Sequence, residues 1–118
     1  MRMETKSLFT EFMGDSPTIR VLDYLLTERE LDFSITDIAE NAGIGRATLY
    51  RIWDNLIKSK IILSTRIIGK AKLFKLNADN KKIKKLMEIY DMLVIEELKT
   101  HSTAPLKTAQ NSGVEIPA

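Results

Sequence analysis

The chain has 118 residues, 44% of them hydrophobic and 29% charged, which is typical of one ordinary globular domain with a modest core. Cysteine is absent, which excludes disulfides and thiolate metal sites and is typical of a protein from a reducing cytoplasm. The N-terminal residues lack the apolar run of a secretory signal, and no stretch is apolar for long enough to span a membrane. We therefore expect a cytoplasmic protein that does not contact membranes.

Positive charge is concentrated in the middle of the chain, although the net charge is only +2. Residues 44–85 contain twelve Lys/Arg and two Asp, whereas the remainder contains six basic and fourteen acidic residues. Such an asymmetry is typical of a surface that binds a polyanion. A lysine-rich surface that is merely solvated gives the same pattern, so charge alone does not decide between the two.

Two helices are predicted in the N-terminal quarter of the chain. Apolar residues at helical spacing in residues 8–13 indicate a short helix that ends near Gly14, so residues 1–14 form an N-terminal helical extension. Ser16 is a typical N-cap, and Pro17 is a typical first residue of the second helix. The main domain, residues 15–77, begins with this second helix.

The stretch that follows predicts two helices joined by a sharp turn. "LDFSI" alternates like a brief strand, and Thr36 is expected to cap the helix that contains "DIAENA". Gly43 can adopt the positive φ that a tight turn between helices requires. Gly45 can then cap the next helix, from Arg46 to about Lys58. The turn makes this last helix protrude from the domain.

The two faces of the protruding helix differ in chemistry. Leu49, Trp53 and Leu56 fall together on an apolar arc at 100° per residue, and we expect them, Trp53 included, in the core. The opposite arc and its shoulders carry donors, acceptors and a methyl group of the kinds that read a major groove. These candidate DNA contacts are Arg46, Ala47, Thr48, Tyr50, Arg51 and Asn55.

A β-hairpin is predicted next, within residues 62–76, because two β-branched runs are joined at "IGKA". Its candidate DNA contacts are Arg66, Lys70 and Lys72, which could follow a phosphate backbone or reach a minor groove. Edge strands also carry lysine simply to prevent aggregation between sheets, and that alternative stays open.

A long helix is predicted to start near Asp79 and to occupy most of residues 78–100, before a tail, residues 101–118, that is expected to be disordered. The helix is apolar over more of its circumference than packing against one small domain requires. We therefore expect a homodimer, with packing against the helix's own domain as the alternative. The expected dimer interface is Ile83, Leu86, Tyr90, Leu93, Val94 and Leu98.

Residues 35–54, with "GIGRATLYR" as turn and recognition helix, resemble the helix-turn-helix of winged-helix DNA-binding regulators. The hairpin at 62–76 looks like the wing, and "DFSIT" looks like the small strand that completes the winged sheet. The similarity covers roughly residues 17–76 and extends into the long helix, as in small prokaryotic regulators of the ArsR, MarR and PadR kind. It implies a mainly α fold with a small β-wing and a C-terminal dimerisation helix. Gly45 departs from these families, which more often have serine or another polar cap there.

The resemblance implies a sequence-specific double-stranded DNA-binding transcriptional regulator that acts as a homodimer. Two alternatives remain: an architectural or plasmid-partition-type DNA-binding protein, and a winged-helix adaptor for other proteins. An enzyme is not expected, because the sequence has no phosphate-binding glycine loop, cysteine nucleophile or histidine pair. No catalytic residue, cofactor or metal site is predicted, and the sequence does not indicate a small-molecule effector.

Overall fold

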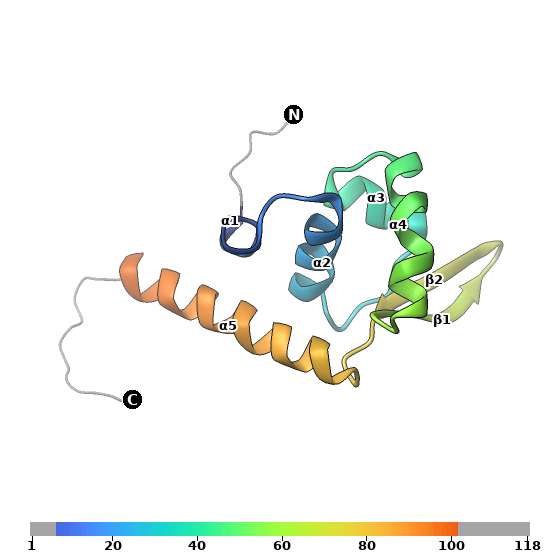
Figure 1. The fold of residues 1–118 in the computed structure, drawn as a ribbon. Coiled ribbons are helices and arrows are strands. Elements are labelled where there is room, and N and C mark those ends of the chain that lie inside the picture. Colours follow the sequence, from blue (N-terminus) through green and yellow to red (C-terminus); the bar gives the residue numbers. More distant parts are fainter. Residues whose placement is uncertain (1–6, 102–118) are drawn as a thin grey trace.

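The computed structural model describes residues 7–101, with the side chains of residues 7–99. The expected tail from residue 102 onward and the first six residues of the N-terminal extension lie outside the described residues. Figure 1 shows a compact group of helices with a hairpin on one side and a long helix leading away from it. The elements are α1 (Leu8–Met13), α2 (Pro17–Thr27), α3 (Ile35–Ala42), α4 (Arg46–Lys58), β1 (Ile62–Ile68), β2 (Ala71–Leu76) and α5 (Lys81–His101).

Local capping accounts for where α2 and α3 begin. The hydroxyl of Ser16 accepts a hydrogen bond from the N–H of Ile19 at 3.2 Å, and Pro17 is the first residue of α2, as the sequence predicts. The N-cap of α3 is Ser34, whose hydroxyl accepts from the N–H of Asp37 at 3.1 Å. The expected cap at Thr36 is therefore wrong, because the helix already begins at Ile35.

The segment before α3 does not form the expected strand. Phe33 makes a single antiparallel bridge to Phe74, in which each N–H donates to the other carbonyl at 2.8 Å. The winged sheet among the described residues is thus the β1–β2 hairpin extended by one bridge. This bridge still joins the loop after α2 to the hairpin.

The core lies where α2, α3 and α4 meet the base of the hairpin. Trp53 packs edge-on against Phe74, with ring centroids 4.9 Å apart and an interplanar angle of 87°. Trp53 is only 9% exposed, which confirms its expected place in the core. The buried apolar side chains are Phe9, Val21, Leu22, Leu25, Leu26, Ile38, Ala39, Leu49, Trp53, Leu56, Ile62, Phe74, Leu76 and Ile83.

Tyr90 and its neighbours join α5 to the first two helices. The Tyr90 ring packs against Phe9 of α1 with centroids 5.9 Å apart, and its hydroxyl is hydrogen-bonded to that of Thr27. Arg29 lies over the same ring, 5.7 Å from its centroid, and forms an ion pair with Asp91 at 2.9 Å. These contacts anchor the first half of α5 on its own domain.

Most apolar residues of α5 fall into two sets by their exposure, which we call its first and second stripe. The first stripe packs against the core of the same chain and consists of Ile83, Leu86, Met87, Tyr90 and Leu93. The second stripe is exposed and consists of Met92, Val94, Ile95 and Leu98. The interface expected from sequence mixes members of both stripes. Ile83 is 1% exposed within its own chain and has no surface left for a partner, so its assignment to a dimer interface is wrong.

Candidate nucleic-acid interface

Two glycines form the turn that places α4. Gly43 ends α3 with φ 72° and ψ 34°, the left-handed conformation that was expected of it. The N–H of Ile44 reaches back to the carbonyl of Ala39 at 3.0 Å, which closes the turn. Gly45 is the N-cap of α4 in an extended conformation and provides no capping side chain. No side chain at the N-cap therefore accepts a hydrogen bond from the backbone N–H groups in the first turn of α4.

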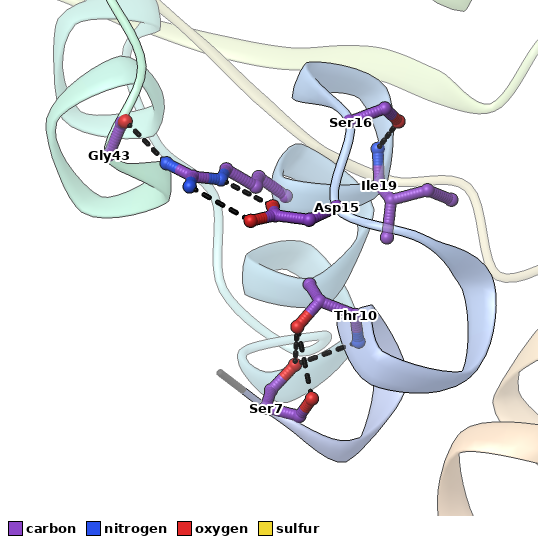
Figure 2. Close-up of polar contacts among 7 residues, drawn as sticks. Ser7, Thr10, Asp15, Ser16, Ile19 and Gly43 are labelled. Atoms are coloured by element: carbon purple, nitrogen blue, oxygen red, sulfur yellow. Dashed lines mark hydrogen bonds and ion pairs between the residues drawn. The ribbon is translucent and has the colours of Figure 1, made fainter. Parts of the chain in front are cut away.

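Arg20 of α2 links the turn between α3 and α4 to the segment just before α2. Its guanidinium donates to the Gly43 carbonyl at 3.0 Å and to both carboxylate oxygens of Asp15, at 2.7 and 3.1 Å (Figure 2). Sequence reasoning missed this contact because residues 20 and 43 belong to different helices. Their pairing depends on how α2 packs against α3, which no local pattern encodes. We infer that Arg20 positions the turn.

An open pocket of about 310 Å³ borders the first turn of α4. The pocket extends from the Arg20–Asp15 ion pair to the N-terminus of α4. Its lining residues are Asp15, Pro17, Arg20, Ile44, Gly45 and Thr48. Backbone N–H groups at a helix N-terminus attract anions such as phosphate. The pocket is thus a place where a phosphate group could approach the chain, beside the polar face of α4.

The structure places the candidate contacts of α4 on one side of the helix. Leu49, Trp53 and Leu56 are buried, as the apolar arc predicts. Thr48 is partly buried at the edge of the pocket. The remaining candidates are exposed, and they are Arg46, Ala47, Tyr50, Arg51 and Asn55.

Arg46 and Tyr50 lie one turn apart on this polar face. A guanidinium nitrogen of Arg46 is 3.4 Å from the Tyr50 hydroxyl, a long hydrogen bond between exposed groups. Tyr50 is 51% exposed, so its ring is available to an external partner rather than packed away. A solvent-facing helix with this set of donors and acceptors has the chemistry and width to enter a major groove.

The hairpin pairs in an antiparallel register with an irregularity between Ser64 and Arg66. Its tip is Gly69, with φ 62°, followed by Lys70. A glycine at the first central position is typical of a two-residue type II′ turn. Lys70 and Lys72 are exposed, as a phosphate contact requires.

Arg66 differs from the two lysines because it already has a counterion. It forms a two-pronged ion pair with Asp32 at 2.9 and 3.1 Å, and the Thr65 hydroxyl donates to the same carboxylate. These hydrogen bonds, first that of Arg66 and then that of Thr65, hold the pKa of Asp32 at about 2, below its ordinary 3.8. Sequence reasoning grouped Arg66 with Lys70 and Lys72, whereas the structure uses it to fasten the hairpin to the loop after α2.

Within residues 7–101, no three His, Cys, Asp or Glu side chains gather where they could hold a metal ion. No helix of this part of the chain is long and apolar enough to cross a membrane.

A protruding helix after a tight turn, followed at once by a basic hairpin, defines a winged helix-turn-helix protein. The sequence model of the Mga helix-turn-helix domain matches residues 2–63, more than half of the chain. The chain belongs to this family of helix-turn-helix domains. The match ends just inside β1, so it includes the two helices of the turn but not the complete wing. No curated protein matches the chain.

Solved winged-helix proteins share the fold at low sequence identity. MepR, a transcription regulator of a Staphylococcus aureus multidrug efflux pump, is 19% identical with a TM-score of 0.56, over 83% of this chain and 70% of its own. NadR in complex with 4-hydroxyphenylacetate is 16% identical with a TM-score of 0.59, over 86% of each chain. A homodimeric winged helix-turn-helix DNA-binding domain from Mycobacterium bovis is 14% identical with a TM-score of 0.52, over 83% of this chain and 85% of its own. The winged-helix fold expected from the sequence is confirmed.

Proposed function

We propose that the protein is a sequence-specific double-stranded DNA-binding transcriptional regulator that acts as a homodimer. The observation that carries the proposal is the exposed polar face of α4, beside a hairpin with exposed lysines. The basic residues of the chain are concentrated in this same segment, which suits a polyanionic partner. Membership of a helix-turn-helix family supports the same function.

In the proposed binding mode, α4 (residues 46–58) lies in the major groove and reads base edges. Arg51 and Thr48 have the side chains for direct readout, while Arg46 at the start of the helix suits a phosphate. Asp54 is exposed further along α4 and would be repelled by DNA, so only the first half of the helix enters the groove. The wing, residues 62–76, contacts the backbone or the minor groove through Lys70 and Lys72.

The second apolar stripe of α5 supports the homodimer. Among the residues expected in the interface, Val94 is 37% exposed and Leu98 is 62% exposed. Met92 and Ile95, which sequence reasoning left out, are 58% and 52% exposed beside them. An apolar stripe of this kind is typical of a helix that packs against a twin. Two copies would present two recognition helices to two half-sites of an operator.

A salt titration of duplex binding tests the proposal. A dimer that makes roughly 6–10 phosphate contacts should lose about 10³–10⁵ in affinity between about 50 and 200 mM salt. Footprinting should then show protection of a discrete palindrome with half-sites about one duplex turn apart. Affinity that stays flat with salt would contradict DNA binding, and uniform coating of the duplex would indicate an architectural protein instead.

A further inference from the structure

The wing ends in two exposed isoleucines, which the proposed binding mode does not use. Ile67 is 66% exposed and Ile68 is 54% exposed, at the last two positions of β1. Together with Gly69 and Lys70 they form the wing tip, residues 67–70. Large aliphatic side chains at the end of a hairpin lie far from the core of their own domain, so they gain little for folding. Successive side chains of a strand face opposite sides, so both sides of the wing tip expose an apolar side chain. Apolar side chains exposed in this way indicate an interaction surface.

The wing tip is held at a defined place relative to α4. The ion pair between Arg66 and Asp32 lies immediately before Ile67 in the chain. The Thr65 hydroxyl, at the irregularity of the hairpin, donates to Asp32, and its oxygen lies 3.3 Å from the carbonyl oxygen of Leu73. Figure 1 shows the hairpin projecting past α4, with its tip as the outermost part of that side of the molecule. A surface that binds α4 would therefore meet the wing tip as well.

The charges around the wing tip favour an anionic partner. Lys72 is the cross-strand neighbour of Ile67, and Lys70 lies in the turn. Residues 62–76 contain no Asp or Glu, so the hairpin itself contributes only positive charge beside the exposed isoleucines. A minor groove offers a complementary surface, with anionic phosphates along both rims, sugars along its walls, and base steps at its floor that an apolar side chain can partly unstack.

We propose that Ile67 and Ile68 form an apolar wedge that enters the minor groove of duplex DNA and partly unstacks one base step. The inference rests on the proposed function and extends it to bending of the bound duplex. Apolar wedges of this kind kink DNA by about 20–90° toward the major groove. The unstacking costs least at pyrimidine–purine steps, so the wedge also selects sequence at a position that α4 does not read.

The test compares a double variant, Ile67→Thr with Ile68→Thr, with wild type. Threonine keeps the β-branched shape that suits the strand while making the tip polar. The matched control is Leu63→Thr, because Leu63 is an exposed aliphatic residue of β1 at the base of the hairpin, 38% exposed and paired with Lys75. The probe is a duplex selected from random sequence by binding to the wild type, labelled at both ends for energy transfer.

The wild type should bend this duplex, and the double variant should bend it clearly less. The double variant should also bind roughly tenfold more weakly, because part of the apolar burial at the tip is lost. Its salt dependence should match that of wild type, since no cation has been removed. Leu63→Thr should keep the wild-type bend and affinity.

Three results would overturn the wedge. One is a double variant with the bend and affinity of wild type, and another is a wild type that binds the duplex without bending it. In both cases the proposed DNA binding would stand. The third is an equal loss of bend in the double variant and in Leu63→Thr, which would assign the effect to the stability of the hairpin. If selection yields no duplex that the wild type binds, the proposed function fails together with the wedge.

Discussion

Arg66 and Lys70 lie four residues apart in the wing, yet their side chains have different tasks. Arg66 is held by Asp32, whereas Lys70 is exposed in the turn. A guanidinium can bind both oxygens of a carboxylate at once, which suits it to fastening one element to another. The ammonium group of lysine, at the end of a flexible aliphatic chain, can contact a phosphate without needing a fixed geometry. The individual partners of these residues, rather than their common charge, decide their roles.

The variant Arg66→Ala should raise the pKa of Asp32 from about 2 toward its ordinary 3.8, because the largest cause of the depression is removed. A carboxylate with a depressed pKa stabilises the folded state above its ordinary pKa. The contribution of this ion pair to stability is therefore nearly complete above about pH 4 and is lost as the pH falls through about 2, where Asp32 is protonated in the folded protein as well. Carboxyl titration by NMR measures this pKa, and Lys70→Ala should leave it unchanged. An unchanged pKa in Arg66→Ala would contradict the fastening role.

The variant Arg51→Ala tests base readout by α4. We expect it to cost roughly 1–3 kcal/mol of binding free energy and to relax preference at one position of each half-site. Lys70→Ala is the matched control, because it should weaken all sequences alike and reduce the salt slope by about one per subunit. Binding to a panel of single-base operator variants distinguishes the two effects. Intact sequence preference in Arg51→Ala would place the reading face of α4 elsewhere.

The two glycines of the helix-turn-helix illustrate how one element is oriented by backbone conformation. Gly43 has a positive φ that residues with a side chain rarely adopt, whereas Gly45 has φ −73°, and a Cβ added there would meet no atom within 4 Å. Only Gly43 is therefore required for the turn. Gly45 is the N-cap but has no side chain that accepts a hydrogen bond, so a polar residue at this position would make the protein more stable.

The variants Gly43→Ala and Gly45→Ser should consequently change stability in opposite directions. Gly43→Ala should lower the free energy of unfolding by about 1 kcal/mol, or roughly 4–8 °C in melting temperature, because alanine is strained in the left-handed conformation. Gly45→Ser should raise the free energy of unfolding by a few tenths of a kcal/mol, since its hydroxyl can accept from the first turn of α4. Thermal unfolding followed by circular dichroism measures both. A neutral Gly43→Ala would mean that the turn relaxes without strain.

At the scale of the whole molecule, α5 packs against its own domain and also exposes apolar side chains. Its first stripe packs against α1, α2 and the rest of the core, and its second stripe faces outward. Leu93 belongs to the first stripe, so a charge there would disturb the domain as well as a dimer. Ile95 belongs to the second stripe and is the cleaner probe of the proposed interface.

The variant Ile95→Glu should split the proposed dimer while the domain stays folded, because it would bury like charges without partners in the interface. Leu31→Glu is the matched control, since Leu31 is 53% exposed and lies in the loop after α2 rather than on α5. Sedimentation at micromolar concentration measures the mass of wild type and both variants. A monomeric wild type would contradict the homodimer, and a dimeric Ile95→Glu would place the interface elsewhere.

Local sequence patterns were sufficient for the order of the elements, the turn at Gly43 and the inward face of α4. Each of these depends on residues a few positions apart, whose spacing follows directly from helical and strand geometry. The same reasoning placed the cap of α3 two residues late and took the single bridge at Phe33 for a strand. The first error concerns a helix boundary, where Ser34 and Thr36 compete for the role of N-cap. The second concerns pairing with Phe74, which is distant in the sequence.

Only the tertiary structure decided which partner each long side chain meets. Arg20 reaches Gly43, Arg66 reaches Asp32, and Ile83 turns into the core, and each partner lies far away in the sequence or in another element. Periodicity shows that a helix such as α5 has excess apolar surface, but it does not say which stripe its own domain covers. That division depends on how the helices pack in three dimensions, because the same spacing of leucines and isoleucines is compatible with either face.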